Sequence, residues 1–244
     1  MTTKALIFDY GGTLDTNGLH WSHVLWEGFQ HVSQNVPFVA PLSVVTWQDF
    51  REAYVYAERT LGREEIIQPT DNFHQVLLKK VDLETQYLHA QGIWQPAEGE
   101  RQQTVVKIAA YCDEYVQRNI ERARRLLEKL AKTYRLVLVS NFYGNIRTIL
   151  QDYGLTHFSA VIESAEVGIR KPDPAIYRLG VEATGVNANE CCVIGDSFGK
   201  DVVPANSLGC QTVWLKGKSW DREEVDETVP THIIGSLSEL EHLL

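Results

Sequence analysis

Residues 4–16 read KALIFDYGGTLDT, and this stretch decides how the rest of the chain is interpreted. A continuous apolar run ends in Asp9, and two glycines follow shortly after it. Such a run is typical of a strand that is buried on both faces, as the strands of parallel sheets are. Because open parallel sheets carry their functional groups at the carboxyl ends of the strands, Asp9 is a candidate catalytic carboxylate. The alternative is that Asp9 caps a turn or a helix.

Five more apolar runs of this kind occur between residue 135 and the end of the chain: RLVLVSN, AVIES, CCVIGD, QTVWL and HII. Helical segments with recognisable ends lie between them. Asp173 followed by Pro174 predicts a helix start, and Ser236 with Glu239 predicts a capping box that opens the last helix. The alternation of strands and helices predicts an α/β fold whose core is a doubly wound, Rossmann-like parallel sheet.

A long helical insertion separates the first predicted strand from the second. Thr46 caps a segment with apolar residues at helical spacing, and residues 72–92 and 104–116 continue the helical pattern. A further apolar stripe over residues 120–130 predicts the first helix of the core. The tryptophans and tyrosines of the insertion are expected to pack its helices together. Arg59 and Arg63 are expected to lie on a solvated face beside glutamates.

These patterns divide the chain into two predicted domains. Residues 1–16 and 119–244 form the Rossmann-like core, and residues 17–118 form an inserted, all-helical cap domain.

Composition and charge exclude several classes of protein. The chain has 244 residues, 44% of them hydrophobic, and a net charge of −9, which would repel nucleic acid. The apolar run at the N-terminus is too short for a secretory signal or a membrane span, so we expect a cytoplasmic protein with no membrane partner. The four cysteines show no CxxC spacing and are expected to be reduced and buried.

Polar residues follow the predicted strands, where the chemistry of such a sheet is expected. Three strand ends and an adjoining loop provide Asp9, Ser140, Asn141, Asp196 and Lys171, and Asp201 follows five residues after Asp196. Clustered carboxylates hold a hard cation such as Mg²⁺, and a cation together with a lysine can neutralise a phosphoryl group. A carboxylate can also attack phosphorus and form an aspartyl-phosphate intermediate. The pattern therefore favours phosphoryl transfer.

Four of these segments, in this order, resemble the motifs of the haloacid dehalogenase (HAD) superfamily: DYGGTL, VLVSN, RKPDP and GDSFGKD. The resemblance covers almost the whole core and places the cap between the first and second motifs. It implies that Asp9 is the nucleophile and that Lys171 balances the charge of the nucleophile and the phosphate. It implies four Mg²⁺ ligands: the side chains of Asp9, Asp196 and Asp201 and the backbone carbonyl of Gly11. Alternatively, Asp201 supports Lys171. It implies the substrate-binding residues Gly12, Thr13, Ser140, Asn141 and Lys171.

One position departs from the family pattern. Phosphatases of this superfamily carry a second aspartate two residues after the nucleophile, where this chain has Gly11. That aspartate protonates the leaving group and then activates the water that cleaves the aspartyl-phosphate. Asp15, His20 and Tyr10 are nearby in sequence and are candidates to replace it. The simpler interpretations are that Asp15 forms a turn, that the His20 ring is packed, and that Tyr10 acts through its backbone.

The leading hypothesis is a Mg²⁺-dependent phosphatase that acts on a small phosphorylated metabolite through an aspartyl-phosphate. One alternative is a non-catalytic protein that binds a phosphorylated ligand in the same cradle. Another is a hydrolase of carbon–halogen or phosphonate bonds. The sequence gives neither the substrate nor the oligomeric state.

Overall fold

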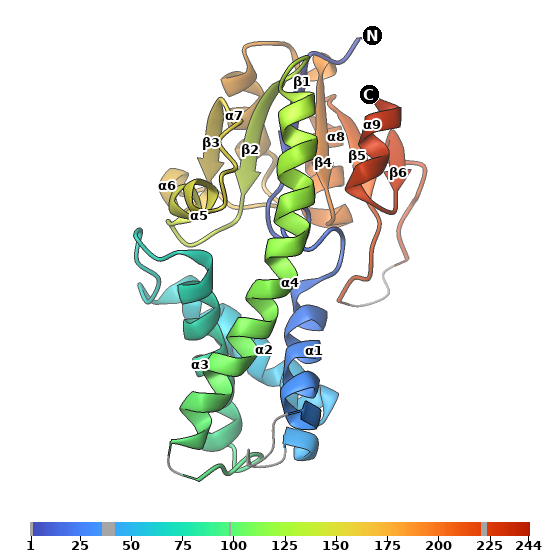
Figure 1. The fold of residues 1–244 in the computed structure, drawn as a ribbon. Coiled ribbons are helices and arrows are strands. Elements are labelled where there is room, and N and C mark those ends of the chain that lie inside the picture. The colour runs from blue at the N-terminus through green and yellow to red at the C-terminus, as the bar shows by residue number, and fades with distance from the viewer. Residues whose placement is uncertain (1, 36–41, 98, 221–223) are drawn as a thin grey trace. The chain divides into compact units, whose positions relative to one another are not determined.

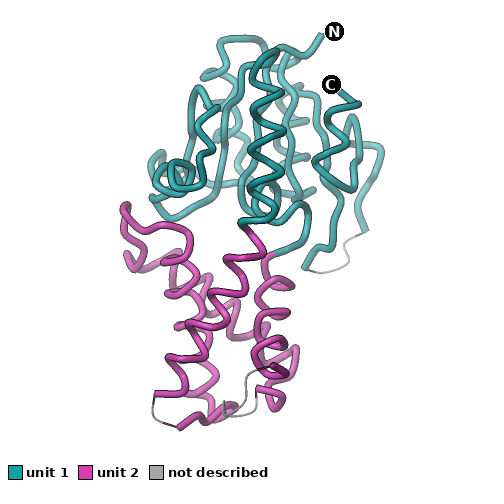
Figure 2. Tube along the Cα trace, viewed as in Figure 1, with its two compact units in different colours: residues 1–20, 117–244 teal, residues 21–116 magenta. Residues whose placement is uncertain are grey.

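The structure is a computed structural model that describes residues 2–35, 42–97, 99–220 and 224–244. The chain folds into two compact units, coloured separately in Figure 2. The first consists of Met1–His20 and Gln117–Leu244, and the second of Trp21–Val116.

The first unit is built on one sheet of six parallel strands (Figure 1). Their order is β3-β2-β1-β4-β5-β6, so the chain starts in the middle, builds outward to one edge and then to the other. This is the strand order of the Rossmann fold. The strands are β1 (Ala5–Phe8), β2 (Arg135–Ser140), β3 (Ala160–Glu163), β4 (Cys191–Gly195), β5 (Gln211–Leu215) and β6 (His232–Ile234). The predicted fold class, a doubly wound parallel sheet with an all-helical insertion, is confirmed.

The central strands are buried because hydrophobic side chains cover the sheet. All four residues of β1 and all five of β4 are buried. On one side, α7 (Pro174–Thr184) packs against β1, β2 and β3 and contributes Ile176 and Tyr177 to the core. Gly180 allows this close approach, since a Cβ atom there would lie 2.7 Å from Val139 Cγ2.

The helix ends of this unit follow the capping residues expected from the sequence. The Asp173 side chain accepts a hydrogen bond from the Ala175 N–H, and Ser236 forms a capping box with Glu239. All four cysteines are free and buried, as predicted. The remaining helices of the unit are α5 (Ile146–Asp152), α6 (Ser164–Val167), α8 (Val203–Ser207) and α9 (Leu240–Leu243).

The secondary structure elements described in the second unit are all helices. It contains α1 (Trp21–Asn35), α2 (Trp47–Arg63), α3 (Phe73–Ala90) and the first half of α4 (Glu100–Leu130). Thr46 and Asp49 form the predicted capping box of α2. The aromatic residues pack the helices together as expected: Trp26, for example, lies 5.5 Å from Trp47 and 5.3 Å from Phe50 between ring centroids. Arg59 and Arg63 are exposed.

Helix α4 differs from the sequence expectation. The apolar patterns at residues 104–116 and 120–130 were expected to form two helices in two domains, but they form one continuous helix of 31 residues. No proline or glycine lies at residues 117–119, and the one residue there that favours a helix start, Asn119, does not interrupt the helix. The two units divide after His20 and within α4, before Gln117; the domain boundaries expected after residues 16 and 118 stay a prediction. No described helix is long and apolar enough to cross a membrane.

A buried carboxyl group lies in the core of the second unit. Glu84 on α3 is fully buried, and neither of its carboxyl oxygens has a hydrogen-bond partner among the described residues. The pKa of Glu84 is raised from 4.5 to about 8, because the effect of burial and the smaller effect of Glu58, which both raise it, outweigh that of Lys80, which lowers it. The Lys80 ammonium forms an ion pair with Glu58. Burial, and next to it the charge of Glu84, raises the pKa of the Cys112 thiol on α4.

We expect this carboxyl group to make the free energy of unfolding depend on pH. Between pH 4.5 and 8 the folded protein holds the Glu84 proton more tightly than the unfolded chain, so stability falls as the pH rises. Between pH 5 and 8 the loss amounts to roughly 3 kcal/mol. Urea denaturation should show this slope in the wild type and in the exposed control Glu114→Gln. Glu84→Gln should show a shallower slope, because only the Glu84 contribution is lost, and an unchanged slope would contradict a protonated Glu84.

Candidate functional site

Three polar side chains lie together at the carboxyl ends of neighbouring strands. Asp9 directly follows β1, Ser140 is the last residue of β2, and Asp196 directly follows β4. Because β2, β1 and β4 are adjacent and parallel, these residues share one edge of the sheet. Asp9 is 6% exposed and Ser140 is 1% exposed. The edge lies where the strand order reverses, which is where open parallel sheets bind their ligands.

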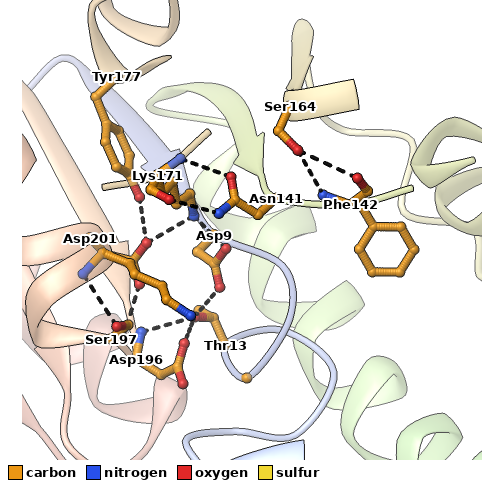
Figure 3. A network of polar contacts seen from close by, with 12 residues as sticks. Asp9, Thr13, Asn141, Phe142, Ser164, Lys171, Tyr177, Asp196, Ser197 and Asp201 are labelled. Carbon is orange, nitrogen blue, oxygen red and sulfur yellow. Dashed lines mark hydrogen bonds and ion pairs between the residues drawn. The ribbon is translucent and has the colours of Figure 1, made fainter. Parts of the chain in front are cut away.

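Lys171 brings a positive charge into this edge (Figure 3). Its Nζ atom lies 2.5 Å from Asp9 Oδ1 and 2.8 Å from Asp201 Oδ1, and its side chain is 3% exposed. Asn141 holds the lysine backbone at both polar groups: the Lys171 N–H donates to Asn141 Oδ1, and Asn141 Nδ2 donates to the Lys171 carbonyl. The amide of Asn141 therefore positions Lys171. Contact between Asn141 and a substrate stays a prediction.

Asp201 is fixed by three donors. Its Oδ1 atom accepts from Lys171 and, at 2.7 Å, from the Tyr177 hydroxyl, and its Oδ2 atom accepts from the Ser197 N–H. A Cβ atom at position 195 would lie 2.5 Å from the Asp201 side chain, so Gly195 is needed for this approach. These contacts fit the expected support of Lys171, and the carboxylate of Asp201 also remains a candidate metal ligand.

Thr13 connects two of the carboxylates. Its hydroxyl lies 2.9 Å from Asp9 Oδ2 and 3.2 Å from Asp196 Oδ1, and it accepts a hydrogen bond from the Asp196 N–H. The loop that carries Thr13 is held by Asp15, whose Oδ1 atom accepts from the Gly12 N–H at 2.7 Å. Asp15 is thus a buried turn residue, as expected, and it engages the Gly12 N–H that was a candidate for phosphate binding.

Gly12 is required for both backbone and steric reasons. Its φ angle is +95°, and a Cβ atom would lie 2.3 Å from Asp196 Oδ2. We expect Gly12→Ala to lower the free energy of unfolding by roughly 1–3 kcal/mol, since it combines a strained backbone with a clash. Gly11→Ala is the matched control, because nothing lies within 4 Å of a Cβ there. Equal unfolding midpoints for the two variants would contradict this geometry.

The site holds more negative than positive charge. Burial raises the pKa of Asp9, although Lys171 lowers it, and burial together with the charges of Asp9 and Asp201 raises the pKa of Asp196 well above its ordinary value. Burial acts to lower the pKa of Lys171, but the two carboxylates outweigh it and raise that pKa to about 12. Three carboxylates thus share one ammonium, and a bound cation would relieve their repulsion.

The donor set fits a hard divalent cation. Asp9, Asp196 and Asp201 each offer a carboxylate oxygen, and these oxygens lie within 4.8 Å of one another. Oxygen ligands of this kind suit Mg²⁺. Ser140 offers a second sign of a ligand, because its Oγ atom is buried and has no hydrogen-bond partner among the described residues. A hydroxyl in this position could donate to a phosphoryl oxygen.

The alternative proton donors near the loop are packed. His20 lies against Trp220 with ring centroids 5.4 Å apart. Tyr10 is 0% exposed and its ring packs edge-on against Phe142. These contacts agree with the structural roles expected for both residues.

Two residues of the site were missed by sequence reasoning. The Tyr177 hydroxyl donates to Asp201, and the Trp214 indole Nε1 donates to the Asp196 carbonyl at 2.9 Å. Both lie in apolar stretches and are indistinguishable by pattern from core residues. The only signal was the position of Tyr177 on the helix that follows the RKPDP segment.

Comparison with known proteins gives a family and several relatives. A family model described as haloacid dehalogenase-like hydrolase matches residues 3–209. A haloacid dehalogenase-like hydrolase domain-containing protein 3 from Danio rerio is 38% identical over 104 residues, 42% of this chain and 43% of that protein. A phosphoserine phosphatase from Thermus thermophilus is 37% identical over 117 residues, 47% of this chain and 46% of that protein. The chain thus matches less than half the length of either relative.

The fold also has solved counterparts. The putative HAD-hydrolase YfnB from Bacillus subtilis superposes with a TM-score of 0.58 and 20% sequence identity, over 100% of this chain and 99% of that one.

Proposed function

The chain belongs to the haloacid dehalogenase-like hydrolase family, and we propose that it is a Mg²⁺-dependent phosphatase in which Asp9 attacks the phosphorus of a small phosphorylated substrate. The observation that carries the proposal is the environment of Asp9. A buried carboxylate at a strand end contacts an ammonium and a hydroxyl and lies among further carboxylates that suit a cation. The phosphatases among its relatives support the same reaction class.

The side chains divide the work of the first step. Asp9 forms a bond to phosphorus, and Lys171 balances the charge that nucleophile and phosphoryl group bring together. The Ser140 hydroxyl donates to a phosphoryl oxygen, and Asn141, Asp201 and Tyr177 hold Lys171 in place.

Asp9, Asp196, Asp201 and the Gly11 carbonyl are the proposed Mg²⁺ ligands. When bound, Mg²⁺ supplies positive charge that offsets the repulsion between these carboxylates and the phosphoryl group. The helical insertion is proposed to act as the cap domain that shapes substrate specificity.

The test of this function is phosphate release from a panel of phosphate esters and acyl phosphates. Release should require Mg²⁺, fall to background in EDTA and return when Mg²⁺ is added back. Mg²⁺ at a hundredfold excess over its Kd should also stabilise the wild type by about 2.7 kcal/mol. Asp196→Asn should show a smaller shift, and equal shifts for the two proteins would contradict the ligand assignment.

Two other functions remain in competition, and the same panel separates them. The first is a dehalogenase, which would release halide from 2-haloacids. A halide ion leaves carbon without being protonated, so this reaction does not need the general acid that Gly11 cannot provide. A non-catalytic protein would be stabilised by phosphate and Mg²⁺ without turnover on any substrate.

A further inference from the structure

The glycine at position 11 is not required by the fold. Nothing described lies within 4 Å of a Cβ built there, the residue is exposed, and its φ angle is outside the left-handed region. Gly12, its neighbour, has both a positive φ and a steric reason to be glycine. A larger residue thus fits at position 11, and the chain nevertheless carries no side chain two residues after the nucleophile.

Other groups on the same loop are held away from the role of a general acid. The Asp15 carboxyl is 0% exposed and accepts the Gly12 N–H. The Thr13 hydroxyl contacts Asp9 and Asp196, and Tyr10 is 0% exposed. The loop can therefore orient the nucleophile but offers no positioned donor to a departing oxygen.

The consequence depends on the leaving group. An alkoxide, which is about as basic as hydroxide, departs only if it is protonated, whereas a carboxylate, whose conjugate acid has a pKa of about 4, does not need a proton. A positioned general acid contributes roughly 10²–10⁴-fold to the rate when protonation is needed. A site without this acid therefore favours substrates with acidic leaving groups over substrates with basic leaving groups by the same factor.

We infer that this site, if it has the phosphatase function proposed above, hydrolyses phosphoryl compounds with acidic leaving groups, such as acyl phosphates. In the first step an Asp9 oxygen bonds to phosphorus and the bond from phosphorus to the leaving oxygen breaks. The electron pair stays on that oxygen, which departs as a carboxylate anion. In the second step water attacks phosphorus, the Asp9 carboxylate is released, and the extra proton of the water passes to solvent.

The experiment compares one series of substrates on three proteins. The substrates are acetyl phosphate, 4-nitrophenyl phosphate, phenyl phosphate and ethyl phosphate, and the measured quantity is kcat/KM with Mg²⁺. The proteins are the wild type, Gly11→Asp and Gly11→Asn, the last of which adds a side chain of the same size without an acid.

We expect kcat/KM of the wild type to fall steeply as the leaving group becomes more basic. Gly11→Asp should raise kcat/KM for ethyl phosphate relative to that for acetyl phosphate by roughly 10²–10⁴-fold, which flattens the dependence. Gly11→Asn should keep the steep dependence.

A wild type that hydrolyses ethyl phosphate as readily as acetyl phosphate would overturn the inference and leave the phosphatase function standing. If the wild type turns over no substrate in the series, the proposed function fails and the inference fails with it.

Discussion

Replacing Asp9 by Asn is expected to reduce Mg²⁺-dependent phosphate release by about 10⁴-fold or more, the size of effect seen when a nucleophile is removed. The amide cannot form the covalent intermediate. In this variant Lys171 keeps its ion pair with Asp201, so the loss of stability should be smaller than that of Lys171→Met.

The control separates this loss from a general effect of removing an aspartate. Asp152 lies at the end of α5 and is exposed, so Asp152→Asn should leave both phosphate release and stability unchanged. Residual activity of Asp9→Asn within tenfold of the wild type would mean that another group attacks phosphorus.

Replacing Lys171 by Met is expected to damage both activity and stability. Lys171 is the ammonium between Asp9 and Asp201, and removing one partner of a buried ion pair costs about 3–5 kcal/mol. Phosphate release should fall by roughly 10³-fold, because nothing then balances the charge of nucleophile and phosphate. Urea denaturation and phosphate assays measure the two effects separately.

A double variant tests the cause of the instability. Lys171→Met combined with Asp201→Asn removes one of the two carboxylates left unpaired, so it should recover part of the lost free energy of unfolding and none of the activity. A Lys171→Met protein as stable as the wild type would contradict a buried, charged lysine at this site.

Most of the fold could be predicted because its signals are local. Continuous apolar runs marked the six strands, and Asp173, Ser236 and Thr46 marked helix starts through their own side-chain hydrogen bonds. The continuity of α4 could not be predicted from two separate apolar stripes, since a helix can pass from one unit to the next without any change in backbone propensity.

The candidate site was predictable where strand order determines it. Asp9, Ser140 and Asp196 end neighbouring strands, so topology alone places them at one edge. The partners of individual atoms were beyond sequence reasoning. Whether the Gly12 N–H faces a phosphate or Asp15, and whether Tyr177 lies in the core or reaches Asp201, depends on backbone geometry that residue types do not encode. Functional roles of all these residues stay predictions.

The covalent intermediate offers the most direct test of the central claim. The protein is mixed with Mg²⁺ and radiolabelled acetyl phosphate, quenched in acid within the first turnovers, and digested for mass spectrometry. Since position 11 offers no base to activate water for the second step, the phosphorylated form should accumulate, with one phosphoryl group on Asp9 and none in Asp9→Asn. Phosphate release by the wild type with no label on Asp9, or with the label on another residue, would contradict Asp9 as the nucleophile.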